Sequence, residues 1–157
     1  MRLAIVGIVA LALCTQEIPV AHAQEQDVPH PALPAGAGPI DADAPKAFSA
    51  TASGLKYRIL RRGAGAQPKA TNTVKVHYHG WLDSGKAFDS SYERREPIEF
   101  PLNGVIPGWT EGMQLVGQGG MIELAIPAGL GYGARGVPGV IPPGSTLHFL
   151  VELIDVK

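Results

Sequence analysis

Hydrophobic and polar residues alternate in a series of short runs in the C-terminal two thirds of the chain. A period of two places successive side chains on opposite faces of a strand, and these runs are also rich in β-branched and aromatic residues. The pattern therefore predicts strands at residues 54–60, 73–82, 97–102, 119–127 and 146–156.

One window has helical periodicity instead. Residues 107–116 place Trp109, Met113 and Val116 at helical spacing, and Pro107 suits the first turn of a helix. A single short helix cannot connect repeated parallel strands. The sequence therefore predicts an α+β fold, in which one short helix covers the apolar face of an antiparallel sheet.

The N-terminus has the composition of an export leader. Arg2 precedes an apolar run over residues 3–13, and a small-x-small site ends at Ala23. We expect cleavage near Ala23 and localisation in the periplasm or outside the cell. The apolar run is shorter than the roughly 20 residues of a transmembrane helix, so no membrane span is expected.

Cys14, the only cysteine, leaves a second interpretation of the leader open. Bacterial lipoproteins are cut just before a cysteine that follows the apolar run. The bulky Leu13 departs from the small residue that such processing prefers, so export without a lipid anchor is the favoured prediction. Removal of the leader leaves a chain with neither a disulfide nor a reactive thiol.

Proline content divides the rest of the chain. Residues 24–51 combine scattered prolines with alanine, glycine and acidic residues and show no helical period, which predicts a flexible tail or linker after the leader at residues 1–23. The folded domain is predicted at residues 52–157. The net charge of −1 and the pI of about 6.5 give no electrostatic reason to expect nucleic acid as a partner.

Two patterns that could bind a ligand are not supported by their context. The segment GYGARG at residues 131–136 has the glycine spacing of a dinucleotide site, but a Val-Pro-Gly sequence follows where the helix of such a site should begin, which favours a tight loop. His77 and His79 share one face of a predicted strand and could begin a zinc site, but no third ligand lies at ligand spacing.

Hydrolytic chemistry is also not indicated. Ser84, Ser90 and Ser91 lie close to Asp83 and Asp89, where the composition predicts two turns. The chain has no G-x-S-x-G nucleophile elbow, and its cysteine belongs to the leader.

A loop of unusual polarity precedes the last predicted strand. Residues 136–144, GVPGVIPPG, combine turn-forming glycine and proline with Val137, Val140 and Ile141, where loops ordinarily carry polar residues. The composition predicts a stiff loop that presents apolar side chains.

Aromatic and aliphatic residues gather beside other predicted loops as well. Residues of this kind normally belong to the core, but a tyrosine hydroxyl or a tryptophan indole needs a polar partner and often lines a pocket. The residues by themselves leave both interpretations open for Tyr78, Phe88, Phe100, Val105, Ile106, Trp109, Tyr132, Ile141 and Phe149.

The order of three segments resembles the FKBP-type peptidyl-prolyl cis-trans isomerases. The segments are VHYHGWLDSGKAFDSS at 76–91, VIPGWTEGMQL at 105–115 and AIPAGLGYGARGVPGVIPPGSTLHFLVELIDV at 125–156, and the resemblance covers residues 53–157. It implies a five- or six-stranded antiparallel sheet wrapped around one short helix. It also implies isomerisation of X-Pro bonds without a cofactor or metal.

The resemblance further implies a pocket for a substrate proline. Its polar groups are Asp89, the Tyr132 hydroxyl and the backbone N–H of Ile106, with Arg94 in contact with the aspartate. Ile98 and Val137 depart from residues common in the family, which leaves the preference at the pocket rim open. The apolar pocket residues are Tyr78, Phe88, Phe100, Val105, Trp109, Val137, Ile141 and Phe149.

The expected partners are proline-containing polypeptides, together with rapamycin-like macrolides, and we expect a monomer. A second functional hypothesis stays open at this point. The same groove could serve a chaperone module that holds unfolded chains, with isomerisation incidental.

Overall fold

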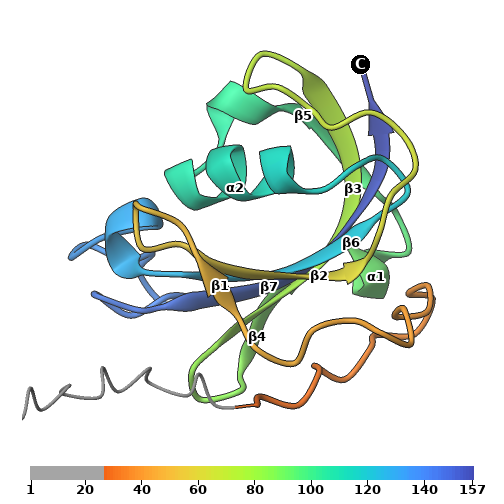
Figure 1. The fold of residues 1–157 in the computed structure, drawn as a ribbon. Coiled ribbons are helices and arrows are strands. Elements are labelled where there is room, and N and C mark those ends of the chain that lie inside the picture. The colour runs from red at the N-terminus through yellow and green to blue at the C-terminus, as the bar shows by residue number, and fades with distance from the viewer. Residues whose placement is uncertain (1–26) are drawn as a thin grey trace, which may run out of the picture.

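The computed structural model describes residues 27–157, and the predicted strands form most of one seven-stranded antiparallel sheet (Figure 1). The strand order is β1-β2-β6-β7-β3-β4, and β5 also pairs with β3. The strands are β1 (Ser49–Ala50), β2 (Lys56–Arg61), β3 (Thr73–Leu82), β4 (Ala87–Ser90), β5 (Ile98–Pro101), β6 (Met121–Ile126) and β7 (Leu147–Val156).

The helices are short and lie between strands. The predicted window at 107–116 forms an α-helix that continues as a 3₁₀ turn, with proline in its first turn as expected. The helical elements are α1 (Ser91–Arg94), η1 (Leu102–Gly104), α2 (Pro107–Gly112), η2 (Met113–Leu115) and η3 (Ala128–Leu130). Within residues 27–157 no helix is long and apolar enough to cross a membrane.

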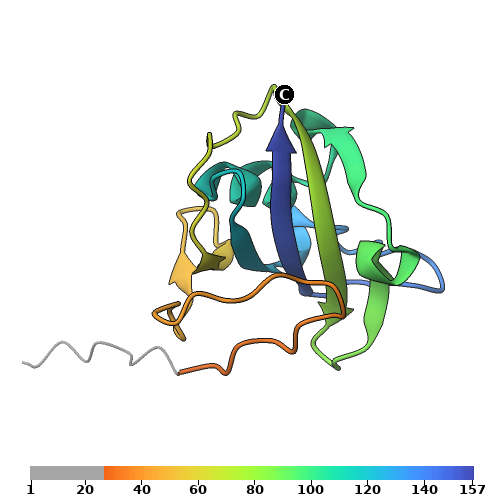
Figure 2. The same ribbon diagram turned by 90° about the vertical axis from the view of Figure 1, so that its right-hand side faces the viewer.

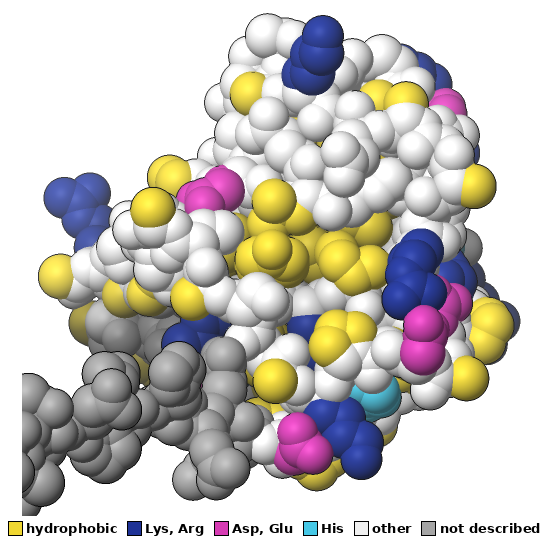
Figure 3. Space-filling view, in the orientation of Figure 1, with side chains coloured by type: hydrophobic (Ala, Val, Ile, Leu, Met, Phe, Trp, Pro, Cys, Tyr) yellow, Lys and Arg dark blue, Asp and Glu magenta, His cyan; other side chains and the backbone are white. Residues whose placement is uncertain are grey.

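The main core lies between the inner face of the sheet and α2. Because side chains alternate along a strand, β3 buries Val74, Val76 and Tyr78 on this face, and β6 and β7 add their own alternate residues. From α2 and η2, Trp109 and Met113 complete the layer. Figure 3 shows hydrophobic side chains reaching the surface between α2 and the β1 and β2 strands, with acidic and basic side chains scattered around them.

The antiparallel sheet with a covering helix confirms the predicted fold class, although the sheet contains seven strands and not five or six. Part of the difference is β4, which lies in a segment whose serines and aspartates predict turns. One turn does form in the first half of this segment. The second half, residues 87–90, pairs with β3 at His79 and Gly80. The composition of this segment favours turns, but residues 87–90 form a strand because they pair with the long strand β3.

Residues 27–48, which we call the N-terminal strap, pack against the domain in the segment where the sequence predicts a tail or linker. Figure 2 shows the strap, in orange, crossing the outer face of the sheet over β7 and β3. Ala37 and Ile40 pack there against a second buried cluster of Leu60, Met121 and Leu150. The predicted leader, its cleavage site at Ala23 and Cys14 lie outside the described residues.

The strap is held by its backbone carbonyls, which composition cannot reveal. The fully buried Arg58 of β2 donates to the carbonyls of Val28 (2.6 Å), Pro29 (2.8 Å) and Lys46 (2.5 Å). Its Nε also donates to Glu123 Oε2 at 2.7 Å, forming an ion pair with side-chain exposures of 0 and 5%. A proline-rich segment with few side-chain donors is therefore ordered by an arginine of the domain.

Candidate active site

A pocket of about 680 Å³ opens beside the N-terminus of α2. It is mostly apolar and takes residues from β3, β4, β5, β7, the start of α2 and the loop after η3. Its lining residues are Tyr78, Phe88, Asp89, Ile98, Phe100, Gly104, Val105, Ile106, Trp109, Tyr132, Val137, Val140, Ile141 and Phe149.

Trp109 lies at the centre of the aromatic residues of the pocket. Its ring meets Tyr78 at a centroid distance of 5.5 Å and an angle of 86°, and Phe149 at 5.2 Å and 87°. Phe100 approaches at 5.5 Å and 62°. Edge-to-face pairs of this kind are the favoured arrangement of aromatic rings, so the indole is fixed in place as an apolar floor.

Gly80 on β3 allows two of these rings to approach the sheet. A Cβ at this position would lie 2.7 Å from Phe88 Cζ and 2.8 Å from Phe149 Cε1. The two rings are themselves packed edge to face at 5.4 Å and 87°. The backbone of the strand thus forms part of the pocket wall, and only glycine leaves room for the rings.

A Gly80→Ala substitution is therefore expected to displace the rings and to impair the pocket. Overpacking of this kind costs about 1–3 kcal/mol, and we expect a loss of roughly tenfold in kcat/KM for the reaction proposed below. Gly129→Ala is the matched control, because a Cβ there would meet nothing within 4 Å. Equal activity of the two variants in an isomerisation assay would show that the ring positions do not matter.

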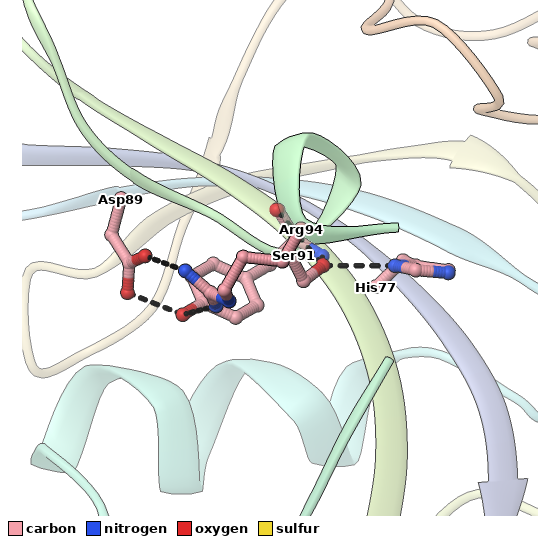
Figure 4. A network of polar contacts seen from close by, with 5 residues as sticks. His77, Asp89, Ser91 and Arg94 are labelled. Carbon is pink, nitrogen blue, oxygen red and sulfur yellow. Dashed lines mark hydrogen bonds and ion pairs between the residues drawn. The ribbon is translucent and has the colours of Figure 1, made fainter. Parts of the chain in front are cut away.

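A polar group of three side chains lies at the edge of the apolar pocket (Figure 4). The Tyr78 hydroxyl donates to Asp89 Oδ2, and Arg94 donates from Nη1 to Asp89 Oδ1 at 2.5 Å and from Nη2 to the Tyr78 hydroxyl at 2.8 Å. Each member is thus bonded to the other two. The arrangement fixes a carboxylate next to the aromatic floor.

The electrostatics of this group favour the charged carboxylate. Partial burial disfavours ionisation of Asp89, but hydrogen bonds from Tyr78 and Arg94 outweigh it and hold the pKa of Asp89 below its ordinary value. Burial, together with the hydrogen bond to Asp89, raises the pKa of Tyr78. At neutral pH the site therefore holds an ionised Asp89 and a neutral Tyr78.

Ser91 and His77 hold the backbone of Tyr78 in place next to this group. The sequence does not predict this role for either residue. The fully buried Ser91 Oγ accepts from the backbone N–H of Tyr78 at 2.8 Å and contacts the carbonyl of Tyr78 at 3.2 Å. His77 Nδ1 lies 2.9 Å from Ser91 Oγ (Figure 4). Ser91 was placed in a predicted turn, and only the fold brings it beside β3.

The loop at 136–144 forms one side of the pocket. Val137 and Ile141 exchange backbone hydrogen bonds of 2.8 Å in both directions, which closes the loop as a small bridge. Gly136 has a positive φ of 61°, and a Cβ there would meet the backbone of Ile141 and lie 2.8 Å from Pro142 C. Ile141 is only 5% exposed, whereas Val140 at the rim is 45% exposed.

Tyr132 and Ile106 are two further lining residues that carry hydrogen-bond donors. Tyr132, in the turn after η3, is 42% exposed. Ile106 precedes α2, and its carbonyl accepts from the N–H of Trp109 and of Thr110. Within residues 27–157 no acceptor pairs with the N–H of Ile106 itself.

The structure brings the predicted site residues together at this one pocket. All of them line it except Arg94, which contacts it through Asp89 and Tyr78. Ile98, which the resemblance places at the pocket rim, and Val140 of the loop at 136–144 also line it. Gly104 lines it too and carries no sequence signal.

Other candidate chemistry is not assembled in the part of the chain that the structure describes. Residues 27–157 contain no group of three His, Cys, Asp or Glu side chains placed to hold a metal ion. The segment at 131–136 forms a turn, as its context predicts.

Comparison with known proteins gives a consistent result. The family model described as FKBP-type peptidyl-prolyl cis-trans isomerase matches residues 65–154. The FKBP-type peptidyl-prolyl cis-trans isomerase FkpA of Escherichia coli is 54% identical over 112 residues, which cover 71% of this chain and 41% of that protein. A probable FKBP-type isomerase of Haemophilus influenzae is 55% identical over 112 residues, covering 71% and 46%. The chain thus spans less than half the length of these relatives.

Solved structures show the same similarity. The crystal structure of FkpA from Escherichia coli has a TM-score of 0.68 and 53% identity, covering 70% of this chain and 51% of that one. The crystal structure of AtFKBP13 has a TM-score of 0.65 and 36% identity, covering 70% of this chain and 98% of that one.

Proposed function

The chain belongs to the FKBP-type peptidyl-prolyl cis-trans isomerase family, and from this premise we propose that its pocket accelerates rotation about X-Pro bonds in exported polypeptides. The observation that carries the proposal is the apolar pocket floored by Trp109 with a carboxylate group at its edge. A pocket of this size has room for a proline ring and its neighbours.

The reaction has a barrier but breaks no covalent bond. Resonance keeps the amide planar, with a rotation barrier of about 18–20 kcal/mol, so an X-Pro bond isomerises over tens to hundreds of seconds. Twisting the C–N bond removes the resonance and makes the amide less polar. The rotation therefore needs an environment that prefers the twisted amide to the planar one.

The pocket supports this preference through its polarity. The aromatic floor and the aliphatic residues around it remove water from the bound amide, and loss of water disfavours the more polar planar state. A proline ring packed on Trp109 is held while the preceding residue rotates. Because the barrier is lowered by environment, the site needs no nucleophile and no proton transfer.

Polar contacts then select and orient the twisted amide. We assign this role to the Asp89 group, to the Tyr132 hydroxyl and to the free N–H of Ile106. The hydroxyl and the N–H donate to substrate carbonyls on either side of the rotating bond. Such donors are already in place before the substrate arrives, so their contribution is not offset by reorganisation.

A Tyr132→Phe variant tests the role of the hydroxyl. The variant keeps the ring and removes one donor, so we expect kcat/KM for an X-Pro peptide to fall roughly 3- to 12-fold, which corresponds to about 0.7–1.5 kcal/mol. Tyr57→Phe is the control, because Tyr57 lies on β2 and does not line the pocket. If Tyr132→Phe retains full activity, the hydroxyl does not contact the rotating amide.

The chaperone hypothesis makes a different use of the same pocket. Tyr132 and Val140 are exposed lining residues of the pocket, so their side chains are open to contact with an unfolded chain. A Tyr132→Ala variant that loses isomerase activity but still suppresses aggregation of an unfolded client would support binding as the main function. Failure of the unsubstituted chain to suppress aggregation would support the isomerase proposal.

The cellular setting of the proposal rests on the sequence. We propose that residues 1–23 direct export to the periplasm or beyond and are removed, and that residues 52–157 form the isomerase domain. Proline-containing polypeptides are the proposed substrates, rapamycin-like macrolides the proposed inhibitors, and the monomer the proposed state. No cofactor enters the proposed reaction.

A further inference from the structure

A chain of polar contacts crosses the outer face of the sheet, on the side opposite α2. It begins at the N-terminal strap and ends at α1, the short helix whose residues hold the polar group of the pocket. Its central member is Glu152 of β7, a carboxylate that takes no part in the reaction proposed above and does not line the pocket.

Three donors from distant parts of the chain converge on Glu152. Its Oε1 accepts from the Tyr92 hydroxyl at 2.5 Å and from the backbone N–H of Gly38 in the strap at 3.0 Å. Its Oε2 accepts from Arg61 Nη2 at 2.6 Å. Arg61 also donates to the carbonyl of Pro39 at 3.1 Å, so the strap is bonded to both members of the ion pair.

Tyr92 connects this cluster to α1. The side chain is 7% exposed, and its ring stacks on His77 of β3 at a centroid distance of 4.7 Å and an angle of 19°. His77 is paired with Glu152 across the β3–β7 ladder. The tyrosine thus lies over one strand and reaches the next with its hydroxyl.

The helix α1 needs such an anchor because it cannot be stable by itself. It has four residues, Ser91–Arg94, and follows the four-residue strand β4. A helix of this length is far below what is stable alone in water. Its position nevertheless fixes both Ser91, which bonds to the backbone of Tyr78, and Arg94, which bonds to Asp89.

We propose that Tyr92 and Glu152 are positioning residues for the isomerase site, and that the strap is their third partner. By tying α1 to the outer face of the sheet, they hold Arg94 and Ser91 where these residues can fix Asp89 and Tyr78. This inference rests on the function proposed above. It adds residues 38–39 to the set of residues that support the site, although they lie outside the region 53–157 that resembles the family.

The ionisation of the cluster is consistent with this role. Burial opposes the charge on Glu152, but hydrogen bonds from Tyr92, Arg61 and Gly38 outweigh it and hold the pKa of Glu152 below its ordinary value. Burial, together with the bond to Glu152, raises the pKa of Tyr92. The hydroxyl therefore remains a donor and the carboxylate an acceptor throughout the neutral range.

A Tyr92→Phe variant of the full chain tests the proposal, since it keeps the ring stacked on His77 and removes only the bond to Glu152. We expect kcat to fall roughly 3- to 10-fold while KM stays within about twofold, because the apolar pocket itself is unchanged. Glu152→Gln, which cannot accept from both Tyr92 and Arg61, is expected to behave in the same way. Tyr57→Phe is the matched control.

Two further measurements separate positioning from loss of stability. If Tyr92 acts through α1, its loss in kcat will not add to that of Arg94→Ala in the double variant. The Tyr78 amide, which donates to Ser91, will exchange its hydrogen several-fold faster in Tyr92→Phe, with the amides of the β6–β7 ladder unchanged.

The outcomes are distinct. Slower kcat with faster Tyr78 exchange supports the proposal, whereas unchanged exchange, or fully additive losses with Arg94→Ala, overturns it. If the unsubstituted chain shows no isomerase activity, the proposed function fails. The exchange of the Tyr78 amide alone then decides whether Glu152 and Tyr92 hold the α1 helix.

Discussion

An Asp89→Ala variant is expected to lose roughly 10- to 100-fold in kcat/KM for an X-Pro peptide, which corresponds to about 1.4–2.7 kcal/mol. The substitution removes the carboxylate at the edge of the pocket and also leaves the Tyr78 hydroxyl and the Arg94 guanidinium without their common acceptor. The variant therefore loses the carboxylate and also leaves the Tyr78 and Arg94 side chains less firmly held. A peptide-isomerisation assay measures the effect directly.

Asp83→Ala is the matched control for this prediction. Asp83 is also on the β3–β4 hairpin, but its side chain is 71% exposed and contacts His148, away from the pocket. We expect this variant to keep full activity. Comparable losses in the two variants would mean that Asp89 acts through general charge or stability and not through its place in the pocket.

The ionisation of Asp89 predicts the pH dependence. Because the pKa of Asp89 in the folded chain lies below the ordinary value of 3.8, its contribution to activity and stability is fully present at neutral pH. That contribution is lost only as the pH falls through the depressed pKa. A decline in activity centred near neutral pH would contradict a role for ionised Asp89.

An Arg58→Ala variant is expected to lose about 3–5 kcal/mol of the free energy of unfolding, measured by urea denaturation. The substitution leaves Glu123 buried without its cation and removes the donor for three carbonyls of the strap. Burial already raises the pKa of Glu123. Without Arg58 the protonated carboxyl is favoured further, so the deficit will grow as the pH rises from the carboxyl range to neutral.

Arg62→Ala provides the comparison for this variant. Arg62 also bonds to the strap, through Asp43 at 2.9 Å, but both side chains are more than two-thirds exposed, at 69 and 68%. Exposed pairs contribute about 0–1 kcal/mol, so we expect a small effect. If Arg58→Ala is as mild as Arg62→Ala, the strap does not depend on the buried pair.

The sequence predicts the elements of this fold that depend on local periodicity. The strands at β3 and β7 follow from alternating hydrophobic residues, and α2 follows from Pro107 and the spacing of Trp109 and Met113. The sequence predicts turns instead of the short strand β4, because the serines and aspartates of the surrounding segment favour turns. Its pairing is imposed by β3, which lies earlier in the chain.

The candidate site divides in the same way. Its aromatic residues stand out because tyrosine and tryptophan beside loops are costly to bury without partners. The supporting contacts of Ser91, Tyr92 and Glu152 are not visible in the sequence, because they join residues as much as 114 positions apart. The packing of the strap cannot be predicted for a related reason. Every residue has a backbone carbonyl, so the sequence does not show which carbonyls accept hydrogen bonds from Arg58.

The central claim is that the pocket over Trp109 accelerates rotation about X-Pro bonds. The most direct test is the relaxation rate of a short peptide with an apolar residue before proline, measured at increasing concentrations of the purified chain. We predict that the rate rises in proportion to the concentration of the chain. A rate that stays at the uncatalysed value, with relaxation over roughly tens to hundreds of seconds at every concentration, would contradict it.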